Sequence, residues 1–267
     1  MTDLNVVRRE PSGTLQHPPL LFVHGAWHGA WCWEEHFLDF FAGRGHRVAA
    51  LDLRGHGSSP SRGRFRTTRM RDYVADVAEV AATFDEPPIV VGHSMGGMVV
   101  QQYLEEHEAP GGVLVASGPP RGVIGITLKV ARQHPLKFIR MNATWSLYPV
   151  VADPEDARAL LFGDQLDEVT ALGYVARVQD ESYVAFLDML LLDRPKPGRV
   201  TAPVLVLGAS QDAIFPPREV HATASAYGTS AVMFDAGHDL MLEPVWPEVA
   251  AAIADWVVGL RPDSSAS

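Results

Sequence analysis

The sequence has few of the features that mark secreted, membrane-spanning or disulfide-bonded proteins. It contains a single cysteine, Cys32, so no disulfide can form within the chain, and a reducing, cytoplasmic location is the simplest expectation. Cys32 lies between two tryptophans, which predicts a buried thiol and not a reactive one. No apolar run approaches the length that a membrane span requires, and the first nineteen residues hold no apolar stretch of signal-peptide length.

Basic blocks and metal-binding patterns are also missing. The net charge is −10 and no block of basic residues occurs, so neither nucleic acid nor an anionic membrane surface is expected as a partner. There is no cysteine pair and no His-Glu-x-x-His. His24 and His28 lie in a glycine-rich loop pattern instead of on a helix. We therefore expect no metal and no other cofactor.

What the sequence does have is a regular alternation of strand and helix patterns. With 267 residues, 47% of them hydrophobic, the chain is long enough for one large domain or for a domain with an insertion. The strand patterns are continuous apolar runs, which is typical of a mostly parallel sheet with helices on both faces. Strands are expected at 4–9, 20–23, 48–53, 89–91, 113–116, 204–207 and 232–234, and helices at 31–42, 70–84, 98–107, 216–227 and 246–260.

Residues 120–199 interrupt this alternation. They contain several helical patterns, scattered aromatic residues and no clear buried strand, and prolines border them on both sides. We interpret these residues as a helical cap segment, inserted into an α/β core that consists of residues 1–119 and 200–261. Residues 262–267 are polar and are expected to be disordered.

The most informative stretch is the motif Gly-x-Ser-x-Gly at residues 92–96. An apolar run precedes it and a helical pattern follows it, so Ser94 is expected in a sharp turn between a strand and a helix. Such a turn lifts the serine hydroxyl above the edge of the sheet and directs the first helix amides at the same point. Since ligands of parallel sheets bind at the carboxyl ends of the strands, other groups that follow strands should meet Ser94 there.

A serine needs a base and an orienting carboxylate to act as a nucleophile. After Ser94, Asp212 follows one predicted strand and His238 follows another, in the chain order that this turn motif requires. We assign Ser94 as the nucleophile, His238 as the general base and acid, and Asp212 as the orienting carboxylate. Asp235 and Asp239 are nearer to His238 in sequence, but neither is well placed behind its imidazole.

An oxyanion that forms on a substrate needs prearranged donors. We assign this role to two backbone amides: that of Ala26, in the loop after the first core strand, and that of Met95, the residue after the nucleophile. His24 is interpreted as a structural residue that braces the same loop. The residues assigned to substrate binding are Trp27, His93, Trp145 and Phe186.

The chain resembles the α/β-hydrolase superfamily over nearly its whole length, outside the cap segment and the tail, in His24-Gly25, Gly92 to Gly97, Asp212 and Gly237-His238. The stretch His24 to Trp33 is similar to the branch that holds plant methylesterases, hydroxynitrile lyases and many bacterial carboxylesterases. This resemblance implies the α/β-hydrolase fold and a serine esterase. The lyases carry a threonine at the place of Gly25 and a lysine at the place of Asp239, so both positions favour the esterases.

These patterns favour a serine hydrolase that cleaves a small, hydrophobic carboxylic ester through an acyl-enzyme. Lactones and thioesters are included in this hypothesis. Three alternatives stay open: a carbon–carbon lyase or hydrolase, a cofactor-free haloperoxidase on the same scaffold, and a small-molecule receptor that keeps the triad.

The cap segment is expected to form an apolar roof over Ser94, because many of its large side chains are apolar or aromatic. Its basic residues fall mainly in its first part and are interpreted as a solvated face. The expected partner is a small-molecule substrate. The oligomeric state is left open, with a homodimer among the options.

Overall fold

The computed structural model describes residues 2–11, 13 and 17–260. Among these residues, seven strands form one sheet in the order β1-β3-β2-β4-β5-β6-β7, in which β1 is antiparallel to β3 and the other pairs are parallel. This arrangement confirms the predicted fold class. The strands are β1 (Val6–Arg9), β2 (Leu20–Val23), β3 (Val48–Leu51), β4 (Ile89–His93), β5 (Gly112–Val115), β6 (Val204–Ala209) and β7 (Ala231–Phe234).

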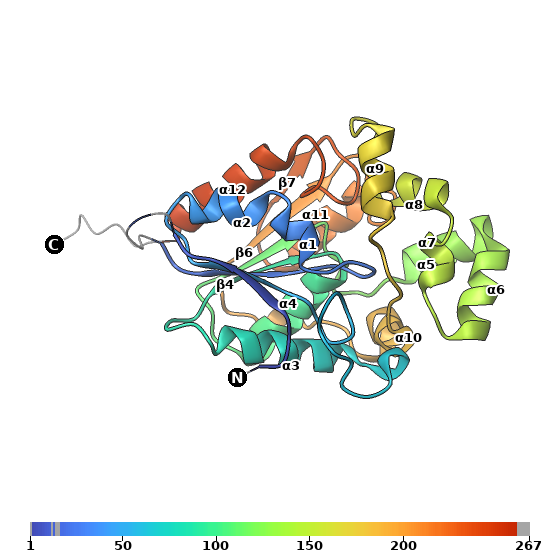
Figure 1. Cartoon of the computed structure of the whole chain (residues 1–267), viewed down its shortest axis with the longest axis horizontal. Helices are drawn as coiled ribbons and strands as arrows, with labels where there is room; N and C mark the ends of the chain where they lie inside the picture. The colour runs from blue at the N-terminus through green and yellow to red at the C-terminus, as the bar shows by residue number, and fades with distance from the viewer. Residues whose placement is uncertain (1, 12, 14–16, 261–267) are drawn as a thin grey trace.

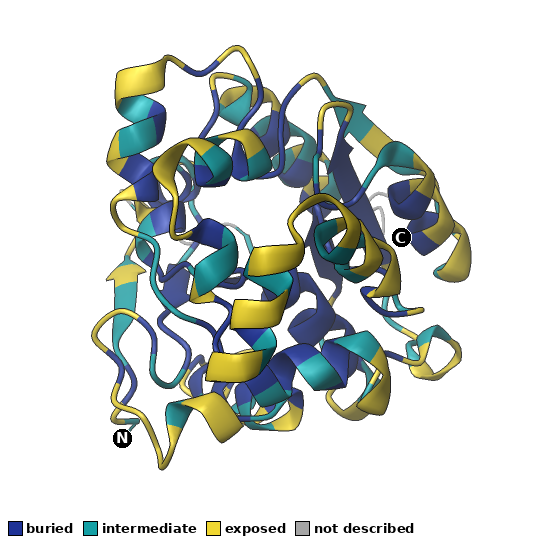
Figure 2. Ribbon diagram, turned by 90° about the vertical axis from the view of Figure 1, so that its right-hand side faces the viewer, coloured by how far each residue is buried: buried dark blue, intermediate teal, exposed yellow. Residues whose placement is uncertain are grey.

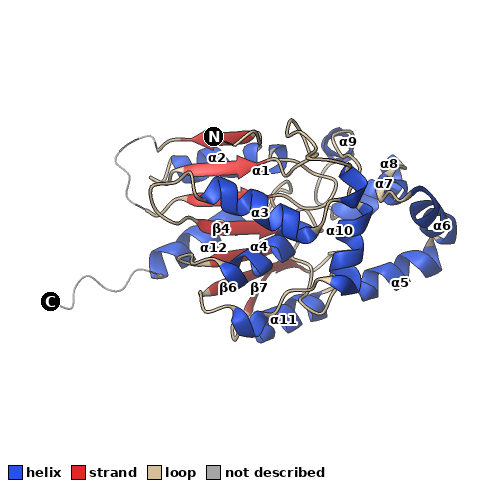
Figure 3. Ribbon diagram, turned by 90° about the horizontal axis from the view of Figure 1, so that it is seen from below, coloured by secondary structure: helices blue, strands red, loops and turns tan. Residues whose placement is uncertain are grey.

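Helices cover both faces of this sheet. The strands from β2 to β6 are fully buried, whereas the edge strands β1 and β7 are partly exposed. Helices α2 and α12 lie on one face, and α3 and α4 lie on the other (Figures 1 and 3). The helices of the core are α1 (Trp31–Glu34), α2 (Phe37–Ala42), α3 (Met70–Ala81), α4 (Met95–Glu106), α11 (Pro217–Ala226) and α12 (Trp246–Gly259).

The single helix expected at 31–42 is two short helices. His36, between α1 and α2, has a φ of −138° and a ψ of −43°, so the backbone leaves the helical region there. Its ring stacks on Trp246, with 4.6 Å between the centroids and 6° between the planes. The break between the two helices thus coincides with a contact to a distant part of the chain. The local sequence pattern does not predict this contact.

The cap segment follows β5 and therefore begins at the same edge of the sheet as the Ser94 turn. Figure 1 shows its helices α5 to α8 at the end of the molecule opposite to α12. No helix in the described part of the chain is long and apolar enough to cross a membrane. The helices of the cap segment are α5 (Ile124–Gln133), α6 (Pro135–Thr144), α7 (Tyr148–Val151), α8 (Pro154–Leu161), α9 (Glu168–Val175) and α10 (Tyr183–Leu187), and a π-helical turn (Asp188–Leu192) extends α10. The tail expected at 262–267, and residue 261 at the end of the core, lie outside the described residues.

Two buried carboxylates connect the cap segment to the core. Glu181 accepts hydrogen bonds from the Tyr73 hydroxyl at 2.7 Å and pairs with His56 Nε2 at 3.0 Å. Asp188 pairs with Arg69, whose Nε lies 3.0 Å from one carboxylate oxygen. Because Glu181 and Asp188 are both completely buried, each depends on these partners to offset the cost of removing its charge from water.

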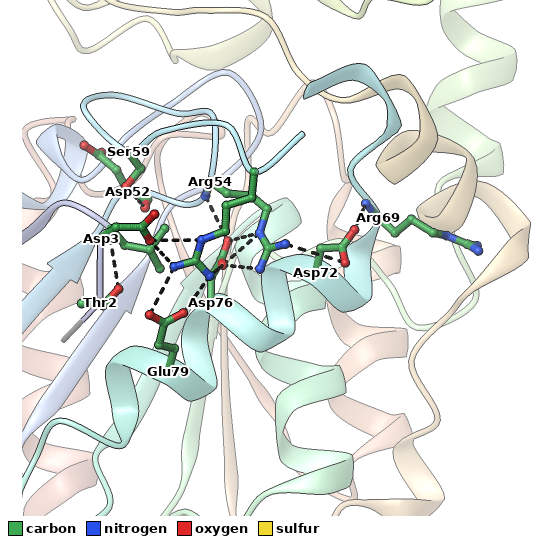
Figure 4. A network of polar contacts seen from close by, with 11 residues as sticks. Thr2, Asp3, Asp52, Arg54, Ser59, Arg69, Asp72, Asp76 and Glu79 are labelled. Carbon is green, nitrogen blue, oxygen red and sulfur yellow. Dashed lines mark hydrogen bonds and ion pairs between the residues drawn. The ribbon is translucent and has the colours of Figure 1, made fainter. Parts of the chain in front are cut away.

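A third buried carboxylate, Asp76 of α3, holds the loop after β3. The guanidinium of Arg54 lies over α3 between Asp72 and Asp76, and its Nη2 is 2.6 Å from Asp76 Oδ1 (Figure 4). Arg62 from the same loop pairs with Asp3 and with Glu79. This network fastens the loop that precedes α3 to that helix and to Asp3.

Candidate active site

Ser94 occupies the sharp turn between β4 and α4. Its φ of 53° and ψ of −117° are unusual for a residue with a side chain, and such strain persists only where the surroundings enforce it. Its backbone amide donates to the carbonyl of Val115, and its carbonyl accepts from Gly118. A Cβ on Gly96 would lie 2.3 Å from the carbonyl oxygen of His24, so only glycine lets α4 begin this close to the loop after β2.

Asp212 and His238 form a direct pair at the same edge of the sheet. His238 Nδ1 lies 2.9 Å from Asp212 Oδ2, and Asp212 Oδ1 accepts the amides of Ile214 and Phe215 at 2.7 and 2.9 Å. The carboxylate is therefore held through both oxygens. We place a proton on Nδ1 of His238, where it can be donated to Asp212. The other ring nitrogen, Nε2, is buried and has no hydrogen-bond partner among the described residues.

The environment of His238 favours its protonated form. Burial alone would lower the pKa of this imidazole, but the charge of Asp212 and its hydrogen bond raise the pKa above its ordinary value. This is the direction that suits a base which must accept a proton from a weak acid during a reaction.

Behind His238 lies a second acid–histidine cluster that the sequence did not suggest. Asp239 Oδ2 lies 3.0 Å from His28 Nε2 and Asp239 Oδ1 lies 3.5 Å from His93 Nε2, and all three residues are buried. Burial opposes charge on these groups, yet the attraction between Asp239 and His28 lowers the pKa of the acid and raises that of the histidine. The sequence signal was present, since Asp239 directly follows His238, but nothing local linked it to His28.

His93 belongs to this cluster and not to the cavity. Burial, together with the nearby His238, lowers the pKa of His93 to about 3, so this imidazole is neutral at any working pH. Its Nε2 is 3.1 Å from the carbonyl oxygen of His238, to which a neutral ring can donate. The residue that precedes Ser94 therefore fixes the backbone of His238, and the two rings lie 4.7 Å apart.

Glu243 fixes the same loop from the other side. It accepts the amide of Gly237 at 2.7 Å and that of Gly163, after α8, at 3.0 Å. Burial raises the pKa of the Glu243 carboxyl, although both amide bonds oppose this shift. The loop that carries His238 is thus tied to the cap segment as well as to His93, the residue before Ser94.

Ala26 and Met95, whose amides are assigned to an oxyanion, line the same cavity as Ser94. Met95 is the first residue of α4, and the first amides of a helix have no partner within the helix. Ala26 belongs to the loop after β2, the strand next to β4, and it lines the same cavity as Ser94 and Met95. Trp27 has a φ of 68°, so the chain is also strained directly after Ala26.

Ser94 lies in the wall of a narrow apolar cavity of about 90 Å³. Ser94 and Thr127 carry the only side-chain hydroxyls among the described residues that line it. The other lining residues are Ala26, Trp27, Met95, Met98, Val123, Ile126, Val130, Phe138, Met141, Leu147, Val150, Leu160, Phe186, Met189, Ile214 and Phe215.

Of the four residues assigned to substrate binding, the structure places Trp27 and Phe186 in the cavity wall and the other two elsewhere. His93 is buried beneath the site, within the cluster around Asp239. Trp145 is 54% exposed and contacts Tyr183 on the outside of the cap segment. It follows α6 in a left-handed conformation, with a φ of 52°, which accompanies this outward position.

His24 braces the loop after β2, in line with its interpretation as a structural residue. Its Nε2 accepts the amide of Leu53, and its Nδ1 lies 2.8 Å from the carbonyl oxygen of Gly25. In the described part of the chain, the group with a spacing suited to a metal ion is His93, His238 and Asp239, whose ligand atoms lie within 4.8 Å of one another. Each of these side chains contacts a neighbouring protein group, while His93 Nδ1, His238 Nε2 and Asp239 Oδ1 are buried without a hydrogen-bond partner among the described residues.

Comparisons with known proteins agree on one family. Residues 20–252 match the sequence model of the Alpha/beta hydrolase family. The chain is similar to norfluorocurarine synthase 2 from Strychnos sp, with 32% identity over 159 residues, 58% of this chain and 55% of that protein. It is also similar to a non-heme chloroperoxidase from Streptomyces lividans (40% over 109 residues, 38% and 37%) and to methylesterase 9 from Arabidopsis thaliana (38% over 80 residues, 29% and 30%). The chain thus spans about half the length of the first of these relatives, and less of the other two.

Solved structures extend the likeness to the whole chain. Monoacylglycerol lipase from Paleococcus ferrophilus superposes with a TM-score of 0.69, over 97% of this chain and 99% of that one, at 22% sequence identity. At this identity the likeness shows the fold alone.

Proposed function

The chain belongs to the alpha/beta hydrolase family, and from this we propose that it is a serine hydrolase that cleaves a small, hydrophobic carboxylic ester through an acyl-enzyme on Ser94. The observation that carries the proposal is the Asp212–His238 pair beside the strained Ser94 turn. His238 Nδ1 is 2.9 Å from Asp212, while His93, which precedes Ser94, lies 3.1 Å from the His238 carbonyl. Methylesterase 9 is a relative whose name fits this chemistry.

In the proposed reaction, His238 Nε2 takes the hydroxyl proton of Ser94 as the serine oxygen attacks the ester carbonyl carbon. The carbonyl oxygen becomes an oxyanion that the amides of Ala26 and Met95 stabilise. The carbon–oxygen bond to the alcohol then breaks, and His238 returns the proton to the leaving alcohol. Water attacks the acyl-enzyme in the same way, with His238 as its base, and releases the acid and free Ser94.

The cavity supports a neutral, hydrophobic substrate. Its walls are almost entirely apolar, so a charged acyl group would lose its hydration without gaining a partner. We also propose a cytoplasmic location, because a chain with one cysteine forms no internal disulfide.

Gly25 supports a hydrolase over a lyase. A Cβ at this position would lie 2.7 Å from His93 Nδ1 and 2.9 Å from the Cβ of Ser94. The threonine that the related lyases carry at the corresponding place therefore does not fit here without a shift of the nucleophile. In this chain, Gly25 brings the backbone of the loop after β2 up to Ser94.

Replacing Ser94 by alanine tests the proposal. Ser94→Ala should lower kcat for ester hydrolysis by about 10⁶ and abolish labelling by a fluorophosphonate probe, while the circular dichroism spectrum stays unchanged. Ser210→Ala is the matched control, since Ser210 also follows a core strand but is exposed and bonds to Asp235. Near-normal hydrolysis by Ser94→Ala, or equal loss in the control, would contradict the proposed nucleophile.

A second candidate is peroxide-dependent halogenation, which the likeness to the non-heme chloroperoxidase favours. Ser94 would serve as the nucleophile in both reactions, so a Ser94 variant cannot distinguish them. A comparison of substrates can. Faster halogenation of monochlorodimedone with peroxide and acetate than hydrolysis of every ester in a panel would favour this second function.

A further inference from the structure

The outward side of helices α5 and α6 carries apolar and basic side chains that the proposed reaction does not use. Its four aliphatic side chains are between 43% and 75% exposed, whereas those of the core are buried. Figure 2 looks onto this end of the molecule, where exposed segments predominate in the helices nearest to the viewer. The outer α5–α6 face consists of Ile124, Leu128, Arg132, Leu136, Ile139 and Arg140.

Helical spacing separates this face from the cavity. On α5, positions 124, 128 and 132 follow one another at four-residue intervals and form one stripe. Ile126 and Val130 point the other way and line the cavity, as do Phe138 and Met141 on α6. One pair of helices thus has an apolar side towards the candidate active site and a second, partly apolar side towards solvent.

The charge of this region is opposite to that of the whole chain. Residues 121–152 contain five arginines and lysines and no aspartate or glutamate, although the net charge of the protein is −10. Arg121 pairs with Glu219 and Lys137 pairs with Asp156. Arg132 and Arg140, which belong to the outer face, form no ion pair with any described residue. At physiological salt the Debye length is about 8 Å, so acidic groups elsewhere on the protein are largely screened. Of the nearby carboxylates, Glu219 and Asp156 are paired with Arg121 and Lys137, which leaves Arg132 and Arg140 as unneutralised charges of the outer face.

We propose that the outer α5–α6 face binds the surface of an anionic phospholipid bilayer. Aliphatic side chains that protrude beside arginines are the pattern of helices that lie in a membrane interface, where the apolar groups enter the acyl boundary and the cations meet the phosphates. The net charge of the whole chain predicts no binding to an anionic membrane surface. The proposal departs from that prediction because positive charge is concentrated on this face. This proposal concerns binding alone and does not depend on which bond the site cleaves.

A second copy of the chain is a poorer occupant. A twofold contact through this face would bring Arg132 and Arg140 of both copies together. Residues 121–152 contain no carboxylate that could neutralise them. An anionic lipid surface supplies both an apolar phase for the aliphatic side chains and a charge opposite to that of the arginines.

Binding to the bilayer would also bring the cavity close to hydrophobic molecules dissolved in it. The helices that contact the lipid are the same ones whose inner sides contribute Ile126, Val130, Phe138 and Met141 to the cavity wall. A neutral ester could then pass from the acyl phase to Ser94 without full exposure to water.

Vesicle co-sedimentation tests the proposal with the full chain. We expect binding to vesicles of phosphatidylcholine and phosphatidylglycerol in a 3:1 ratio, weak binding to pure phosphatidylcholine, and a loss of binding as salt rises. Equal affinity for both vesicle types, or no binding to either at low salt, would overturn it.

Variants locate the contact. Arg132→Gln with Arg140→Gln should lower the partition coefficient about fivefold per charge. Leu136→Ser with Ile139→Ser should lower it on the order of tenfold per residue. All four residues are exposed and lie outside the cavity, so hydrolysis of a short soluble ester and the melting temperature should stay unchanged.

Val169→Ser is the matched control, since Val169 is 83% exposed on α9, away from this face. The control should bind vesicles like the wild type. Full binding by both double variants, or an equal loss in Val169→Ser, would overturn the assignment to α5 and α6. A wild-type dimer that Leu136→Ser with Ile139→Ser dissociates, without any vesicle binding, would assign the face to a second copy instead.

Discussion

The floor and the roof of the cavity are built in different ways. The floor comes from loops at the strand ends, where the buried Asp212 is held by three hydrogen bonds and the buried Asp239 pairs with His28. The roof comes from the cap segment, which faces the cavity almost only with apolar side chains. The floor fixes atoms to within hydrogen-bond geometry, whereas the roof offers only shape and apolar surface. Substitutions in the floor should therefore change kcat. Substitutions in the roof should change which substrate is preferred.

The roof itself has two unequal parts. Its second part is tied to the core through buried Glu181 and Asp188, whereas α5 has no fully buried residue and α6 has one, Met141. The firmly attached part and the exposed part meet at the same cavity. Substitutions in the floor and in each part of the roof should therefore have separable effects.

The largest effect is expected in the floor. Asp212→Asn should leave the protein folded but lower kcat by roughly 10⁴. The amide oxygen would keep the bonds from the Ile214 and Phe215 amides, so its NH2 group would face Nδ1 of His238, donate to it and hold the wrong tautomer. Steady-state kinetics on an activated ester measures this loss. Asp235→Asn is the control, since Asp235 is exposed and bonds to Ser210 and Gln211 instead of the imidazole. An equal loss in both variants would show that Asp212 is not the acid that matters.

Asp239 is not a suitable control in that experiment. Like Asp235, it is not placed behind the imidazole of His238, but it is completely buried and pairs with His28. Its replacement would leave His28 without its partner and would disturb the loop directly.

The attached part of the roof should control stability. Glu181→Ala leaves the buried hydroxyl of Tyr73 and Nε2 of His56 without a partner, which should lower the free energy of unfolding by about 3 kcal/mol. Urea denaturation measures the change. Glu168 is an exposed carboxylate of the same segment, so the free energy of unfolding of Glu168→Ala should stay within about 0.5 kcal/mol of the wild-type value. A similar result for both variants would mean that Glu181 does not fasten the roof.

The third prediction concerns pH and returns to the floor. Asp212 raises the pKa of His238, and only the neutral imidazole can act as a base. The kcat/KM of the wild type should therefore fall about tenfold per pH unit below a pKa that lies above the ordinary histidine value. In Asp212→Asn, burial lowers the pKa of His238 and the charge of Asp212 no longer opposes it. The acidic limb of the residual activity should therefore move to lower pH. A limb that stays in place would assign the titration to another group.

Much of the floor could be predicted from the sequence because its signals are local. The position of Ser94 is predicted by a turn motif with a buried strand before it and a helix after it. Asp212 and His238 each come directly after a strand, and parallel strands end at one edge. The order of elements and the fold class follow from the same short patterns.

The roof could not be predicted to the same depth. Trp145 and Phe186 look alike in the sequence, yet one is exposed and the other lines the cavity, because the rotation of each helix depends on tertiary packing. The role of His93 was missed for a related reason. Its partner Asp239 is distant in sequence, and only the fold brings the two together.

Substrate length should show a moderate effect that belongs to the roof. Along a series of p-nitrophenyl esters from acetate to decanoate, kcat/KM should rise about fourfold per methylene until the cavity is full. Phe186→Ala enlarges the cavity and should move the optimum to a longer chain. Trp145→Ala removes an aromatic side chain that lies outside the cavity and should leave the optimum unchanged. A profile that falls from acetate onwards would show that the apolar roof residues serve internal packing.

The smallest effect, no change at all, is expected when metal ions are removed. His93, His238 and Asp239 have a spacing that a metal ion could use, although each also contacts a neighbouring protein group through another atom. His93 Nε2 lies 3.1 Å from the His238 carbonyl, and Asp239 pairs with His28. Zinc bound to His238 would compete with the proton that this imidazole must accept in the proposed reaction. Prolonged dialysis against a chelator should therefore leave kcat and the pH profile unchanged. A loss of activity that zinc restores in the wild type but not in His93→Ala would show that the cluster beneath Ser94 is a metal site. The reaction would then not be that of a metal-free serine, histidine and aspartate.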